Sequence, residues 1–94
     1  MKATVSALAS LSDHRYRLTE AIPIDVTRED DTFVVTWRGT DDFGFGSSVV
    51  DAIRDLQLTI IDLFATLIES KDDELSEHLR ARRDELKRHI TIAQ

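Results

Sequence analysis

The chain has 94 residues, a hydrophobic content of 41% and a formal net charge of −6. This length predicts one domain spanning residues 1–94, and the hydrophobic content excludes a disordered chain. The absence of cysteine excludes disulfides and thiolate metal sites. No apolar run reaches the roughly 18 residues that a membrane span needs. We therefore expect a soluble cytoplasmic protein without membrane contact, and the acidic balance disfavours nucleic-acid binding by the chain alone.

The first half of the chain predicts a small antiparallel sheet. Residues 1–15, rich in Ala, Ser and Thr, predict a flexible arm or a short helix, and residues 16–46 predict three strands. Alternating Ile22, Ile24 and Val26 mark the first strand, where Pro23 indicates an edge strand or a strand start. The second strand is the β-branched and aromatic run at 32–37.

The third strand is short, because Phe43 and Phe45 alternate with Gly44 and Gly46. Glycines weaken a strand but let another backbone approach closely. Residues 47–69 predict a long helix, and Ser48 is the expected N-cap. Residues 71–92 predict a second, charged helix. The overall expectation is an α+β domain of order β-β-β-α-α.

The long helix carries two apolar stripes, whereas a helix on one sheet needs one. The second helix can cover part of the surplus, but its apolar seam is narrow, so we expect the rest to be buried in a homodimer, since symmetric pairs are the commonest oligomers. The predicted oligomer interface consists of Ile60, Ile61, Phe64, Leu67 and Ile68.

No motif of an enzyme or a cofactor site is present. Phosphate loops, dinucleotide fingerprints, zinc-protease helices and nucleophile elbows are all missing. The acidic clusters lie at turns or at a helix start, where acids serve solubility and capping, and the three histidines are expected in solvent or at an interface. The basic cluster at 80–88 is expected to be a solvated face. We predict no catalytic residues, no cofactor and no metal.

From Ile22 to about Leu67 the order of elements is similar to that of the HicB-like antitoxin domains. The matching segments are Glu29-Asp30-Asp31 at the acidic turn, Phe33-Val34-Val35 in the second strand, Gly46-Ser47-Ser48 before the helix and Asp51-Ala52 at its start. The resemblance implies a partial RNase H-like fold without nuclease activity. Phe43-Gly44-Phe45 replaces the family's Pro-Gly-Cys-like element, and no DNA-binding segment follows.

The resemblance and the acidic charge predict an antitoxin-type module that neutralises a small basic protein toxin, of the RNase kind. Charged rims steer a basic partner and buried aromatics supply affinity. The expected sheet core includes Ile22, Ile24, Phe33, Val35, Trp37, Phe43 and Phe45, on either face of the sheet. The candidate partner-binding residues, expected to share one end of the sheet, are Asp30, Asp31, Asp41 and Asp42, together with Trp37, Phe43 and Phe45 where these are not core. The alternatives are a structural homo-oligomerisation module, or a small ligand-binding or metal-binding domain or enzyme that uses the acidic clusters.

Overall fold

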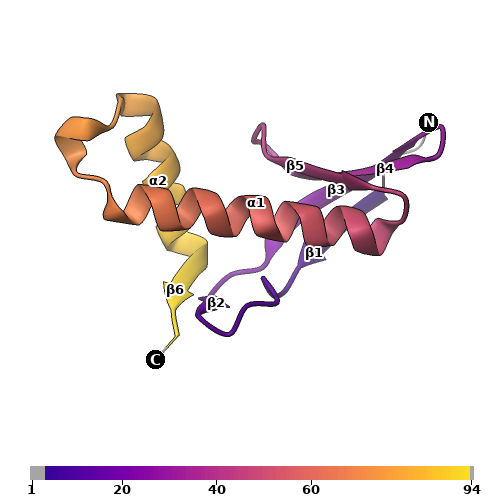
Figure 1. Cartoon of the computed structure of the whole chain (residues 1–94), viewed down its shortest axis with the longest axis horizontal. Helices are drawn as coiled ribbons and strands as arrows, with labels where there is room; N and C mark the ends of the chain where they lie inside the picture. Colours follow the sequence, from indigo (N-terminus) through magenta and orange to yellow (C-terminus); the bar gives the residue numbers. More distant parts are fainter. Residues whose placement is uncertain (1–3, 94) are drawn as a thin grey trace.

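A computed structural model describes residues 4–93 and shows an α+β fold, as the sequence predicts (Figure 1). The larger, antiparallel sheet has the order β1-β3-β4-β5 and consists of β1 (Thr4–Leu8), β3 (Ile22–Glu29), β4 (Thr32–Trp37) and β5 (Phe43–Gly46). A second sheet pairs β2 (Tyr16–Leu18) with β6 (Ile90–Ile92). The helical elements are α1 (Val49–Glu69), the 3-10 turn η1 (Asp72–Glu74) and α2 (Glu77–His89).

Three predictions about the elements are wrong. The segment expected to be an arm or a helix contains β1, which pairs with β3 over five residues. The stretch at 16–18 leaves the main sheet and pairs with the C-terminal strand instead. The second helix is shorter than 71–92, because η1 precedes it and Ser76 caps its start, and because the β-branched run Ile90-Thr91-Ile92 forms β6.

Pro23 lies in an inner strand, between β1 and β4, but at the second position of β3. Its carbonyl oxygen accepts a hydrogen bond from the Arg38 amide at 2.9 Å, one residue beyond the end of β4. Of the two predictions for Pro23, an edge strand or a strand start, the strand start is therefore correct. A proline there interrupts no part of the β3–β4 ladder.

The glycines of β5 permit close contact with α1, as predicted. A Cβ atom on Gly44 would lie 2.2 Å from the Leu56 nitrogen and 2.5 Å from the Ala52 oxygen, and one on Gly46 would lie 2.7 Å from the Asp51 Cβ. The helix begins where expected, since the Ser48 hydroxyl accepts a hydrogen bond from the Asp51 amide. These contacts fix α1 across β4 and β5.

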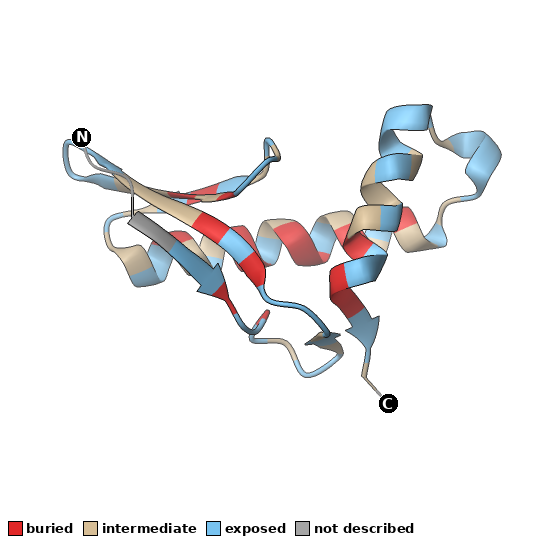
Figure 2. Ribbon diagram, turned by 180° about the vertical axis from the view of Figure 1, so that it is seen from behind, coloured by how far each residue is buried: buried red, intermediate tan, exposed pale blue. Residues whose placement is uncertain are grey.

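The core lies between α1 and one face of the larger sheet, and it continues under α2 (Figure 2). Its fully buried side chains include Ile22, Ile24, Val35 and Trp37 from the sheet and Leu56 and Ile60 from α1. Leu86 and Ile90 close the core at the C-terminal end of the chain. Among residues 4–93, no helix covers the other face of the sheet (Figure 1).

Candidate protein-binding surface

Two phenylalanines stand on the sheet face that no helix covers. Gly44 and Gly46 face α1, so Phe43 and Phe45 point to the opposite side. Their side chains are 51% and 58% exposed, and the two rings stack with centroids 6.3 Å apart. Exposed aromatic neighbours of this kind mark interaction sites more often than single exposed apolar residues do.

The cross-strand neighbours extend this surface across the sheet. Phe45 is paired with Val34 and Phe43 with Thr36, and both of these β4 side chains are only half-buried. Asp25, the β3 neighbour of Thr36, forms a 2.7 Å ion pair with Arg38. The Arg38 guanidinium holds the pKa of the Asp25 carboxyl below its usual value. We call Val34, Thr36, Phe43 and Phe45 the open face; a neutral ion pair borders it on one side.

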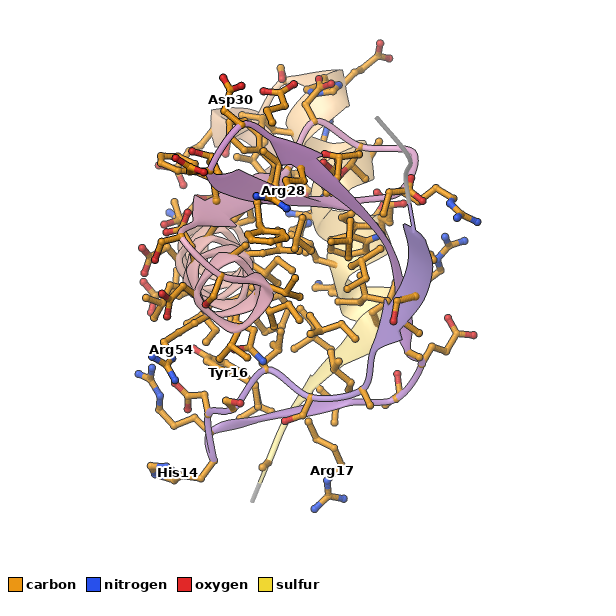
Figure 3. All side chains as sticks on the ribbon, turned by 90° about the vertical axis from the view of Figure 1, so that its right-hand side faces the viewer. His14, Tyr16, Arg17, Arg28, Asp30 and Arg54 are labelled. Carbon is orange, nitrogen blue, oxygen red and sulfur yellow. The ribbon has the colours of Figure 1, made fainter. Side chains whose placement is uncertain are left out.

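The two acidic turns do not share one end of the sheet, contrary to the prediction. The β3–β4 turn carries Asp30 and Asp31, and the β4–β5 turn carries Asp41 and Asp42. The six-residue strand β4 separates them, which corresponds to about 20 Å. Figure 3 shows Asp30 at the tip of its hairpin, pointing into solvent. The acids thus flank the aromatic pair at both ends.

Trp37 is not part of the exposed surface, because its side chain is 1% exposed. It lies on the core face of β4, opposite in orientation to Thr36. The Arg82 guanidinium stacks over the indole at 4.5 Å from the ring centroid, and His89 meets the ring edge-on at 5.2 Å. Trp37 therefore anchors α2 to the sheet and belongs to the core, as predicted, which removes it from the candidate binding surface. The prediction of a solvated or interface His89 is wrong.

The Asp42 side chain also forms its contacts within the chain. Its carboxylate pairs with the Arg82 guanidinium, which also pairs with Glu85. The Arg82 side chain is 11% exposed and that of Asp42 is 19% exposed. Arg83, the next residue, is 13% exposed and pairs with Asp72 at 2.7 Å. The interpretation of residues 80–88 as a solvated face is therefore wrong for two of its arginines.

A hollow of about 410 Å³ borders this ion-pair cluster. Leu63, Leu79 and Ala81 supply its apolar lining, and Asp41, Asp42 and Glu85 supply carboxylates. Arg82 already bonds two of the three acids. Sequence patterns do not predict this cluster, because Arg82 and Asp42 are 40 residues apart. Only the Arg82–Glu85 ion pair can be expected from the sequence, because the two residues lie three positions apart on one helix.

The residues predicted to form an oligomer interface are buried within one copy of the chain. Ile60, Ile61, Phe64 and Leu67 are between 0% and 7% exposed, and Ile68 is half-buried. Phe64 packs against Tyr16 of β2, with ring centroids 5.6 Å apart. The small β2–β6 sheet and α2 thus cover the second stripe of α1, and the stated reason for a dimer is wrong. The oligomeric state itself stays a prediction.

Residues 4–93 contain neither a cluster of metal ligands nor a membrane-spanning helix. No group of three or more His, Asp or Glu side chains within this range could hold a metal ion. Neither helix in the same range has the length and apolar character needed to cross a bilayer.

No protein-family model, no curated protein and no solved structure matches this chain. The similarity to HicB-like domains therefore stays a prediction.

Proposed function

We propose that the chain is a protein-binding module that sequesters a small basic protein, in the way that an antitoxin neutralises a toxic RNase. The observation that carries the proposal is the stacked pair Phe43 and Phe45, half-exposed on a bare sheet face between two acidic turns. An apolar centre with a charged rim is the usual composition of a protein–protein interface.

The charges support a basic partner. The chain has 18 acidic and 12 basic residues, and Asp30, Asp31 and Asp41 are exposed at the ends of the open face. An acidic rim raises the rate at which a basic partner associates, while the aromatic centre slows dissociation. Asp42 and Trp37 are left out of the proposed surface, because both hold α2 in place.

The test co-expresses the chain with the product of the adjacent gene, which the proposal predicts to be a small basic protein, and purifies the two together. Phe45→Ser should weaken the complex about tenfold or more, mainly through faster dissociation. Leu58→Ser is the matched control, because Leu58 is also 58% exposed but lies on α1, away from the open face. The double variant Asp30→Lys with Asp31→Lys should slow association at low salt and have little effect at high salt.

Circular dichroism should show all of these variants folded, since every altered side chain is exposed. Failure of the two proteins to form a complex would argue against the function. Equal affinities for wild type and Phe45→Ser, with Leu58→Ser weakened instead, would move the binding surface to α1.

A further inference from the structure

The larger sheet has two edges, and they differ in how they are protected. At the β5 edge, the Phe45 amide donates a hydrogen bond to the Asp55 carboxylate of α1 at 3.0 Å, and the helix backbone contacts Gly44. At the β1 edge, no hydrogen bond within residues 4–93 reaches the outer side of the strand. An unprotected edge is a template for pairing with another strand.

The register shows which groups of β1 point outward. Arg38 donates to the Pro23 carbonyl, so the main-chain groups of residues 23 and 25 face β4, and those of 22 and 24 face β1. Ser6 is opposite Ile24 and Leu8 is opposite Ile22, which makes their amides the inner ones. In an antiparallel ladder the alternate residues then direct both amide and carbonyl to the free side. These residues are Val5 and Ala7.

The β1 edge is electrically neutral in an otherwise acidic chain. Thr4–Leu8 contains no charged residue and no proline, which are the usual devices that prevent edge pairing. Arg38 neutralises Asp25, the acid nearest in the neighbouring strand. With a net charge of −6 on each copy, two chains repel at most orientations. The β1 strand adds no charge of its own to that repulsion.

We propose that two copies of the chain pair through β1, antiparallel, about a two-fold axis at Ser6. The outward groups of Val5 would then bond those of Ala7 in the second copy, and the reverse pair would form by symmetry. This pairing joins two four-stranded sheets into one continuous sheet. A single short strand buries little area, so we expect a dissociation constant of about 10–100 μM.

Sedimentation equilibrium of the purified chain, from about 10 μM to 1 mM, tests the dimer itself. The average molecular mass should rise from that of one chain toward that of two chains across this concentration range. Ser6→Lys should abolish the rise, because the new ammonium would lie opposite its symmetry mate, whereas the neutral Ser6→Gln should keep it. Ser6 is exposed, so both variants should fold. Ala7→Pro should also abolish dimerisation, because it removes an outward amide only.

Amide hydrogen exchange by NMR locates the contact without a substitution. The Ala7 amide should gain protection as the concentration rises, while the inner Ser6 amide is protected throughout. A monomer at every concentration, or a dimer that persists in both Ser6→Lys and Ala7→Pro, would overturn the proposal. The test uses this chain alone, so its outcome is independent of whether a basic partner binds the open face.

Discussion

Replacing Gly44 by alanine should be among the most damaging single-methyl changes in this chain. The new Cβ would lie 2.2 Å from the Leu56 nitrogen, and ordinary contact begins near 3.4 Å. The separation between β5 and α1 must therefore grow by about 1 Å, since helix backbone cannot yield locally as a flexible side chain can. That shift would loosen the packing of Ala52 and Leu56, both fully buried.

The expected loss lies at the upper end of the range for overpacking, about 3 kcal/mol. For a domain of this size the urea m-value is about 1 kcal/mol/M, so the unfolding midpoint should fall by about 3 M. Trp37 is the only tryptophan and is buried, so its fluorescence reports the transition. A loss of this size is a large part of the stability of a small domain.

The other glycines supply graded controls. At Gly46 the nearest atoms are the Asp51 Cβ at 2.7 Å and the Ala52 nitrogen at 2.9 Å, which are fixed by the helix but overlap the new methyl less than at Gly44, so the loss should be about 1–2 kcal/mol. At Gly39 nothing lies within 4 Å, but the φ angle of +83° is strained for alanine, which costs about 1 kcal/mol. A Gly44→Ala variant as stable as Gly39→Ala would refute the close contact between β5 and α1.

Two further predictions concern the interior and the ion pairs. Phe64→Ala should lower the free energy of unfolding by about 3–5 kcal/mol, which urea titration measures. It should leave the self-association constant unchanged in sedimentation, because Phe64 is buried within one copy of the chain. Acid should destabilise the fold, because Arg38 and Arg83 lower the pKa of Asp25 and Asp72. The native state then binds fewer protons than the unfolded state, so this stability is complete above about pH 5 and decreases as the pH falls further. Urea midpoints measured down to about pH 2 check it, and Asp25→Asn should flatten the decrease.

The sequence predicts the β3–β4–β5–α1 unit because each part carries a local signal. Large apolar side chains recur at every second position, Ile22 and Ile24 in β3 and Val35 and Trp37 in β4, while the β5 glycines mark a close approach and Ser48 caps the helix. Those signals depend only on residues near in sequence. The sequence therefore predicts the bounds of β4, β5 and α1 to within a residue or two.

The remaining elements depend on distant partners. β1 has Ala and Ser at two of its five positions, and β2 and β6 have three residues each, so none is distinct from a loop until its partner is known. The burial of Trp37 likewise depends on Arg82, which lies 45 residues further along the chain. Alternation assigns Trp37 to a face of β4, but only tertiary contacts show which face α2 covers.

The two interaction surfaces are compatible with each other. A two-fold axis at Ser6 is perpendicular to the joined sheet, so the open faces of both copies lie on the same side. β5 is the outer strand at each end of that sheet, and the seven strand spacings between the two copies of β5 amount to about 34 Å. A small basic protein would therefore contact one aromatic pair and leave the other free, which favours two partners for each dimer. Dimerisation uses main-chain groups at the β1 edge, whereas partner binding uses side chains at β5, so neither contact blocks the other.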